Sequence, residues 1–302
     1  MDLNEEIKLL KNKKNAIILA HYYERDEIQD IADIIGDSLA LAQEAAKTDA
    51  DIIVFCGVKF MAETAKILSP KKKVLLPVKD AGCPMADMAN KESVLKKKEE
   101  LNNPVVVSYV NTNADVKSVS DICCTSANAI NVVKSLKEDR VLFVPDKNLG
   151  EYVKENVKEK EVLLWDGYCP THNDFSINNL MLLKQEHPNA KVAVHPESPK
   201  KVRDAADFIG STSGIINFVR NNSNKEFIIG TEEGVLFEIK RQNKGKEFYI
   251  IGKSAICVNM KKTHLEDLYN ALKYEQYEII LNKEIEKKAF KPIEKMISIK
   301  RN

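Results

Sequence analysis

The sequence predicts an α/β fold of three homologous three-layer αβα domains, each with a parallel sheet, arranged around a pseudo-threefold axis. The first observation is an internal repeat. Similar segments begin at Asn15 (NAIILAHYY), Asn103 (NPVVVSYVN) and Asn189 (NAKVAVHPE), 88 and 86 residues apart. The second is that apolar, strand-like runs alternate with helix-like stretches in each repeat, which is typical of parallel sheets covered by helices. Three like units in one chain pack most simply around a shared axis.

The elements of each repeat follow in a fixed order of strand, helix, strand, helix, strand and helix. The first strand is an apolar run with a polar or aromatic tip, and the three tips are His21, Tyr109 and His195. A continuous apolar run of this length indicates a strand that is buried on both faces. We expect second strands at 51–55, 140–144 and 226–230, and third strands at 72–78, 160–166 and 246–252.

The register of the repeat also divides the chain. We predict repeat domains at 1–88, 89–174 and 175–262, followed by a helical tail at 263–302 that packs back on the core. Because crossovers between parallel strands are right-handed, the C-terminal ends of the strands meet at one edge of each sheet, where ligands bind. The three edges are therefore predicted to face one shared cavity.

Three hydroxyl residues mark helix starts at this edge. Ser38, Ser126 and Thr212 align at the same 88- and 86-residue offsets, each where a helix-like segment begins. N-capping by the hydroxyls explains part of this pattern. Helix N-termini also present free N–H groups and a positive dipole end to anions. Three such ends around one cavity favour a substrate with several carboxylates or phosphates.

Each third strand runs into a short loop that holds a cysteine, which is Cys83, Cys169 or Cys257. Around a threefold axis these thiols would converge, and thiolates at one point repel each other unless a cation holds them. Zinc commonly includes histidine among its ligands, whereas an all-cysteine set suits an iron–sulfur cluster. Three reduced thiols in unrelated loops are the alternative. The cysteines that do not recur, and that need no function as small buried residues, are Cys56, Cys123 and Cys124.

The composition is that of an ordinary globular protein. The 302-residue chain is 44% hydrophobic and 30% charged, with a formal net charge of +1. This balance gives no sign of a nucleic-acid or membrane surface, and no apolar run reaches the roughly 18 residues of a membrane span. The N-terminal segment MDLNEEIKLLKNKKN reads as an amphipathic helix, not as a signal peptide. We therefore expect a cytoplasmic protein.

Taken together, the motifs resemble those of the quinolinate synthase family over essentially the whole chain. In order they are AHYY, GDSL, FCGVKFMAETAKILSP, AGCPMA, SYVNT, PDKNLG, GYCPTH, HPE, STSG, GTEEG and VNMKKTHL. The resemblance implies three homologous domains, a central [4Fe-4S] cluster and a deep substrate cavity. The implied reaction condenses iminoaspartate with dihydroxyacetone phosphate to give quinolinate, phosphate and water, a step of de novo NAD biosynthesis.

The resemblance also implies roles for particular residues. The family's cluster ligands fall on Cys83, Cys169 and Cys257, which leaves one open iron that can act as a Lewis acid. Tyr23 matches a residue implicated in the chemistry. The substrate-contacting positions fall on His21, Ser38, Tyr109, Asn111, Ser126, His195, Glu197 and Thr212.

For catalysis, we assign the general base to Glu197, because a carboxylate in a closed cavity can have a raised pKa. Proton transfer and carbonyl polarisation are assigned to His21, Tyr23, Tyr109 and His195. The resemblance leaves the roles of His172 and Asp174 open, because the run HNDF follows Cys169 where a different run is more usual.

Other functions are compatible with the same residues. An aconitase-like iron–sulfur hydro-lyase would use the same open iron on a single hydroxy-acid substrate. A non-catalytic iron–sulfur sensor and a zinc protein are further alternatives. The expected partners are the two small-molecule substrates, with no nucleic acid and no membrane. Because an imine substrate is unstable, we also expect a transient contact with the enzyme that supplies iminoaspartate.

Overall fold

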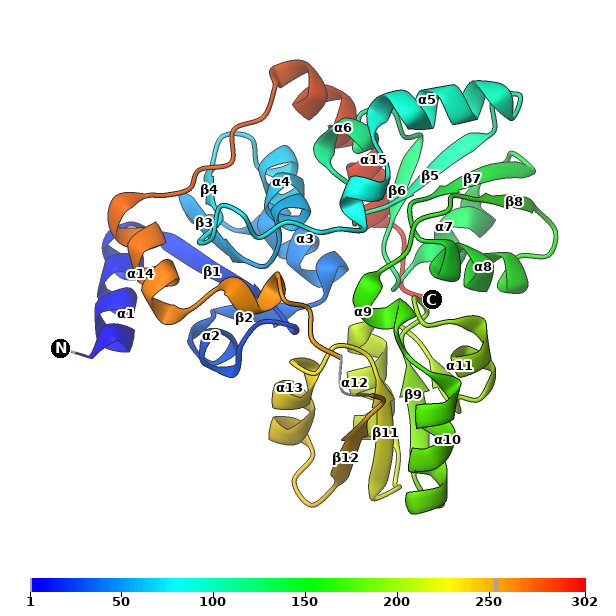
Figure 1. The fold of residues 1–302 in the computed structure, drawn as a ribbon. Coiled ribbons are helices and arrows are strands. Elements are labelled where there is room, and N and C mark those ends of the chain that lie inside the picture. The colour runs from blue at the N-terminus through cyan, green and yellow to red at the C-terminus, as the bar shows by residue number, and fades with distance from the viewer. Residues whose placement is uncertain (1, 253–254) are drawn as a thin grey trace.

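The computed structural model describes residues 2–252 and 255–302, and this part of the chain contains three sheets of four parallel strands each. Helices cover the sheets, and the three sheet units surround a common centre (Figure 1). The predicted α/β class, with three αβα units around a pseudo-threefold axis, is confirmed.

We number the units in chain order. The strands of unit 1 are β1 (Ala16–His21), β2 (Ile34–Gly36), β3 (Ile52–Cys56) and β4 (Lys73–Leu75). Those of unit 2 are β5 (Val105–Tyr109), β6 (Ile122–Cys124), β7 (Arg140–Val144) and β8 (Glu161–Leu164). Those of unit 3 are β9 (Lys191–Val194), β10 (Phe208–Ile209), β11 (Glu226–Gly230) and β12 (Glu247–Ile250). The spatial order β2-β1-β3-β4 recurs as β6-β5-β7-β8 and β10-β9-β11-β12, so the sequence repeat is also a repeat of topology.

Each unit has one strand more than the sequence predicted. The added strands β2, β6 and β10 are only two or three residues long, too short to show a periodicity. An aspartate just before each of them fixes its pairing with the first strand. The Oδ2 atoms of Asp33, Asp121 and Asp207 accept hydrogen bonds, at 2.8 Å, from the backbone N–H groups of Ile18, Val106 and Val192. These aligned aspartates are therefore structural.

The helices follow the strands in the same repeated order. Unit 1 contains α1 (Leu3–Lys13), α2 (Asp26–Ile31), α3 (Ser38–Lys47) and α4 (Lys59–Leu68), with a short 3-10 helix, η1 (Ala86–Met88). Unit 2 contains α5 (Lys91–Glu100), α6 (Ala114–Lys117), α7 (Ala129–Ser135), α8 (Lys147–Asn156) and α9 (Pro170–Asn173). Unit 3 contains α10 (Ile177–Glu186), α11 (Lys200–Asp204), α12 (Thr212–Asn221), α13 (Val235–Gln242) and η2 (Met260–Lys262). The domain boundaries at 88, 174 and 262 stay a prediction.

The last helices, α14 (Leu265–Tyr274) and α15 (Lys283–Ser298), extend beyond the third sheet. Helix α14 returns to unit 1, where it packs beside α1 and β3 (Figure 1). Helix α15 packs against α4 of unit 1 and against α6 and β6 of unit 2. Its residues Ile293 and Met296 are fully buried in the core cluster shared by units 1 and 2. Burial of an apolar side chain of this size contributes about 1.5–3 kcal/mol, so α15 ties the two units together.

The strands explain why the cores lie where they do. All five residues of β3 are buried, as expected for a parallel strand covered by helices on both faces. Separate apolar clusters occupy the two faces of the unit 3 sheet. In the described part of the chain, every helix is too short or too polar to cross a bilayer.

Candidate active site

One cavity lies where the C-terminal ends of the strands of all three units meet. Its empty space, counted together with the part open to solvent, is about 660 Å³. Every site residue predicted from the sequence lines it, and these are His21, Tyr23, Ser38, Cys83, Tyr109, Asn111, Ser126, Cys169, His195, Glu197, Thr212 and Cys257. The convergence of tips, helix starts and cysteine loops on one cavity therefore follows from the fold.

The strand tips form three equivalent pairs. Each unit presents one side chain at the end of its first strand and another two residues later. The pairs are His21 with Tyr23, Tyr109 with Asn111, and His195 with Glu197. In the first and third pairs, the backbone N–H of the later residue donates to the imidazole Nδ1, at 3.2 Å for His21 and 3.4 Å for His195. A neutral ring therefore carries its proton on Nε2.

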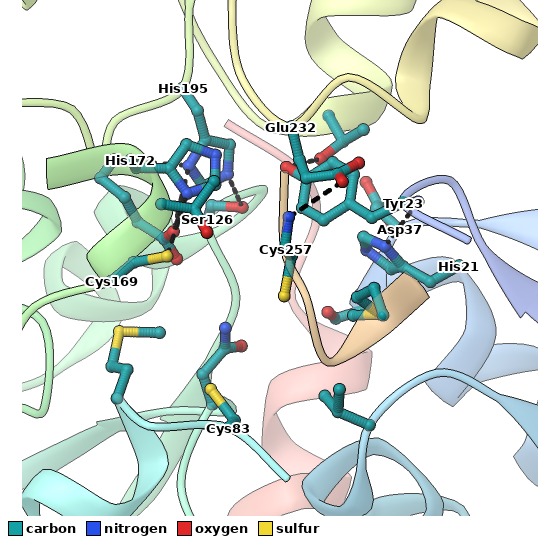
Figure 2. Close-up of a pocket in the computed structure, with 18 of the residues that line it drawn as sticks. His21, Tyr23, Asp37, Cys83, Ser126, Cys169, His172, His195, Glu232 and Cys257 are labelled. Atoms are coloured by element: carbon teal, nitrogen blue, oxygen red, sulfur yellow. Dashed lines mark hydrogen bonds and ion pairs between the residues drawn. The ribbon is translucent and has the colours of Figure 1, made fainter. Parts of the chain in front are cut away.

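The three repeated cysteines lie on different sides of the hollow (Figure 2). Cys83, Cys169 and Cys257 are partly exposed to it, whereas the other three cysteines are buried. Burial raises the pKa of all three thiols, to about 12 for Cys83. A cation is therefore needed to hold them as thiolates.

The spacing of the sulfur atoms distinguishes between kinds of metal group. In residues 2–252 and 255–302, the group of three ligand atoms within 4.8 Å of one another consists of Cys169, His172 and Glu197, not of the three cysteines. Tetrahedral zinc with Zn–S bonds of about 2.3 Å would bring its sulfur ligands to roughly 4 Å from each other. Three thiols facing one hollow at a wider spacing fit a larger group, such as an iron–sulfur cluster.

The helix starts differ in one respect from the prediction. Ser38 and Thr212 are the first residues of α3 and α12, and the caps are the residues before them. Asp37 accepts from the Ala40 N–H at 3.0 Å, and the Ser211 hydroxyl accepts from the Gly214 N–H at 3.2 Å. The prediction that Ser38 and Thr212 are caps was therefore wrong, because the preceding residue has the extended backbone that a cap requires.

Ser126, unlike Ser38 and Thr212, lies outside a helix. Helix α7 begins at Ala129, and the side chain of Asn128 accepts from the backbone N–H of Thr125 at 2.8 Å. Ser126 therefore sits in the turn before the helix, where its hydroxyl lies 3.1 Å from His195 Nε2. Its predicted capping role is likewise wrong, but its side chain remains at the cavity wall.

A chain of hydrogen bonds crosses the cavity from unit 1 to unit 3. The Tyr23 hydroxyl lies 2.8 Å from Thr212 Oγ1 and 2.7 Å from Thr231 Oγ1. Thr231 Oγ1 lies 2.9 Å from His172 Nε2, and His172 Nδ1 lies 2.8 Å from Glu197 Oε2. The buried phenol of Tyr23 is thus connected to the buried carboxylate of Glu197 through Thr231 and His172.

Glu197 does not have the raised pKa that the sequence led us to expect. Burial alone would raise it, but the imidazoles of His172 and His195 outweigh burial and lower the pKa of Glu197 to about 2. The expectation was wrong because it considered burial without the neighbouring rings. Glu197 is therefore ionised, and its Oε1 atom is buried with no hydrogen-bond partner in the described structure.

Other groups around the cavity also have pKa values that differ from their ordinary ones. Burial lowers the pKa of His21 to about 4 and that of His195 to about 3, so both rings are neutral near pH 7. Burial, reinforced by the charge of Glu197, raises the pKa of Tyr109 well above its ordinary value. The Oδ1 atom of Asn111 is buried and lacks a partner among the described residues. Neutral rings, a protonated phenol and unpartnered oxygens suit the recognition of a polar ligand.

The family-model comparison matches residues 5–298 to the family described as quinolinate synthetase A protein. The chain belongs to the quinolinate synthase family. It is 53% identical over 296 residues to the quinolinate synthase of Alkaliphilus metalliredigens, covering 98% of each chain. It is also 50% identical to that of Clostridium kluyveri, covering 98% of each chain. With the quinolinate synthase of Thermodesulfovibrio yellowstonii it shares 50% identity, over 98% of this chain and 97% of the relative.

This member of an enzyme family has cavity residues that sequence reasoning missed. His172 was left open, yet it contacts Cys169, Glu197 and Thr231. The motifs GDSL and GTEEG each contain a further missed residue, Asp37 and Glu232, which also line the cavity. Position alone could have indicated both, because Asp37 comes one residue and Glu232 two residues after the end of a strand.

Proposed function

We propose that this chain is a quinolinate synthase, which condenses iminoaspartate with dihydroxyacetone phosphate to give quinolinate, phosphate and two molecules of water. The reaction needs no oxidant, because the imine already has the required oxidation level. The observation that carries the proposal is the convergence, in one cavity, of three repeated cysteines, two helix starts with the repeated hydroxyl of Ser126, and the ionised Glu197. The family membership of the whole chain supports it. We infer that the enzyme works in the cytoplasm, in de novo NAD biosynthesis.

The cofactor we propose is a [4Fe-4S] cluster held by Cys83, Cys169 and Cys257. The fit rests on three thiols that line one cavity and that, among the described residues, do not form a group with all three sulfurs within 4.8 Å of one another. When bound, such a cluster supplies an open iron that acts as a Lewis acid on a hydroxyl or carboxylate. Zinc held by Cys169, His172 and Glu197 is the competing site, because those ligand atoms do lie within 4.8 Å of one another.

The helix starts are proposed to hold the anionic ends of the substrates. Ser38 and Thr212, the first residues of α3 and α12, line the cavity together with Ser126. Such termini favour carboxylate and phosphate groups. His21, Tyr109 and Asn111 are placed to donate to or accept from the substrate oxygens, and their proposed roles are orientation and carbonyl polarisation.

Proton transfer is proposed to run through Glu197 and its neighbours. The free Oε1 of Glu197 can accept a proton from a substrate carbon or oxygen, while Oε2 stays with His172. A carboxylate with a low pKa is a weak base, and His172 Nδ1 already donates its proton to Oε2. The nitrogen of His172 that is proposed to take up a proton is therefore Nε2, which lies 2.9 Å from Thr231 Oγ1. Tyr23 joins the same relay through Thr231.

The test is anaerobic purification, followed by iron and sulfide analysis and an assay with the substrates separately and together. A quinolinate synthase is brown, contains about four iron atoms, and forms a pyridine dicarboxylate only when both substrates are present. A hydro-lyase would consume one hydroxy acid alone, and a zinc protein would be colourless. An iron–sulfur protein that turns over neither would support the sensor alternative. The partners we propose are these two substrates, together with a transient contact to the enzyme that supplies the imine.

A further inference from the structure

The three cysteine loops are anchored by the same backbone hydrogen bond. In each unit, a residue that follows β3, β7 or β11 donates its backbone N–H to the carbonyl of the residue two positions before the cysteine. The pairs are Lys59 with Ala81, Lys147 with Gly167, and Glu233 with Ala255, each at 2.8 Å. The same backbone hydrogen bond therefore holds all three cysteine loops at equivalent positions in their units.

The residue before each of these donors is not the same in the three units. It is Val58 in unit 1, Asp146 in unit 2 and Glu232 in unit 3. Asp146 Oδ2 accepts from the backbone N–H of Cys169 at 2.9 Å. Glu232 Oε1 accepts from the backbone N–H of Cys257 at 3.1 Å. Two of the three cysteines are thus held by a carboxylate through their own amide.

Each carboxylate is itself fixed in place. Its second oxygen accepts an N–H from the following helical turn, at 2.7 Å from Leu149 for Asp146 and at 2.7 Å from Gly234 for Glu232. Both side chains are fully buried. A buried carboxylate that bridges two amides is a rigid support, because neither oxygen can turn to water without leaving a donor unpaired.

Glu232 is also connected to another unit. Lys261 Nζ lies 3.0 Å from Glu232 Oε1, and it donates to the backbone carbonyl of Tyr23 at 2.5 Å. The support of Cys257 is therefore joined to the strand tip of unit 1.

Among the residues that the structure describes, unit 1 shows no such support. Val58 is buried and carries no acceptor, so its side chain cannot bind the Cys83 amide. The Cys83 loop has the backbone bonds that all three loops share, including the Asp87 N–H that donates to the Cys83 carbonyl at 3.2 Å, but no carboxylate at its amide. The equivalent donors in units 2 and 3 are Asn173 at 2.9 Å and Lys261 at 3.1 Å.

We propose that Asp146 and Glu232 are positioning residues for the metal-ligating Cys169 and Cys257. The Cys83 loop, which lacks such a carboxylate, is then the most mobile of the three cysteine loops. This inference rests on the proposed iron–sulfur function. Partners that orient metal ligands change metal retention when they are removed, by about 10- to 100-fold. Asp146 and Glu232 orient the cysteines by accepting hydrogen bonds from their backbone amides, and are not themselves metal ligands.

The first test follows iron loss to a chelator from anaerobically reconstituted protein. Asp146→Asn and Glu232→Gln each keep one acceptor oxygen, so one of the two amides loses its partner. Both variants should release iron about 10-fold faster than wild type. The matched control is Glu63→Gln: Glu63 is buried, its Oε2 accepts the Ala114 N–H at 2.9 Å, and its ion pair is with the Lys59 side chain and not with the Cys169 or Cys257 loop. Equal release rates for the wild type and both anchor variants would overturn the proposal.

The second test uses metal-free protein and hydrogen–deuterium exchange. Asp146→Asn should speed amide exchange in the peptide that holds Cys169 and leave the Cys257 peptide unchanged, and Glu232→Gln should do the reverse. In the wild type, the Cys83 amide should exchange fastest of the three. Equal acceleration of both peptides, or of neither, contradicts the proposal. A wild type that binds no iron but shows the local exchange pattern would refute the cluster and retain the anchors.

Discussion

At the residue scale, the environment of Glu197 decides its chemistry. The side chain is buried, but His172 lowers its pKa, with Oε2 bound to that imidazole and Oε1 without a partner among the described residues. The sequence placed Glu197 at a strand tip facing a cavity, and that placement is what the structure shows. The direction of its pKa could not be predicted, because His172 comes from another unit and its proximity depends on how the units pack.

Glu197→Gln should lower the rate of quinolinate formation by at least about 100-fold, because an amide cannot take up the proton. The amide has nearly the shape of the carboxylate, so the visible absorption of the reconstituted protein should remain. Steady-state turnover and an anaerobic absorption spectrum check both points. Turnover near the wild-type rate would remove Glu197 from the proton-transfer role.

His21 should make stability depend on pH. Burial lowers its pKa to about 4 in the folded chain, against about 6.5 when unfolded. Between about pH 4 and 6.5, the unfolded chain binds a proton at His21 that the folded chain does not. The contribution of His21 to the free energy of unfolding is therefore complete above about pH 6.5 and is lost as the pH falls towards about 4. The loss by pH 5 is about 2 kcal/mol.

Urea denaturation of metal-free wild type and His21→Gln at pH 7.5 and pH 5 measures this contribution. The comparison between variants is needed because Glu24 and Asp146, whose pKa values burial raises, act in the opposite direction. The wild type should lose about 2 kcal/mol more than the variant. Parallel losses in the two proteins would show that His21 titrates normally.

At the scale of elements, the main strands and the helices could be predicted, and the short strands and caps could not. The runs at β1, β3, β5, β7 and β11 are apolar enough to be read directly. Strands β2, β6 and β10 depend instead on aspartate contacts made across the fold. The caps of α3 and α12 lie one residue before the predicted hydroxyls, and α7 begins after Ser126. Capping depends on backbone angles, which a pattern of hydroxyl residues does not give.

Helix α15 should contribute to stability through its buried face. Ile293→Ala removes a fully buried side chain from the core shared by units 1 and 2, and should cost about 2–5 kcal/mol in the free energy of unfolding. Ile280 is 83% exposed, so Ile280→Ala is the matched control, with a change below about 0.5 kcal/mol. Chemical denaturation measures both. Similar small changes would mean that α15 does not hold the units together.

At the scale of the whole molecule, three copies of one topology enclose the cavity. Each copy contributes a tip pair, a hydroxyl residue at or just before a helix, and a cysteine, and the three cysteines are labelled in Figure 2. The repeat in the sequence predicted this convergence, because equivalent positions in equivalent units must lie at equivalent places. What it could not predict is where the units differ. Val58, Asp146 and Glu232 occupy one repeat position with different chemistry, and the return of α14 to unit 1 depends on packing outside the repeat.

The most direct test is the iron and sulfide content of six single cysteine-to-alanine variants, reconstituted without oxygen beside the wild type. Loss of the cluster is predicted for Cys83→Ala, Cys169→Ala and Cys257→Ala, whose sulfurs face the hollow. Full content is predicted for the matched changes at the buried Cys56, Cys123 and Cys124. A complete cluster in any of the first three variants, or a wild type that takes up no iron, would contradict the account.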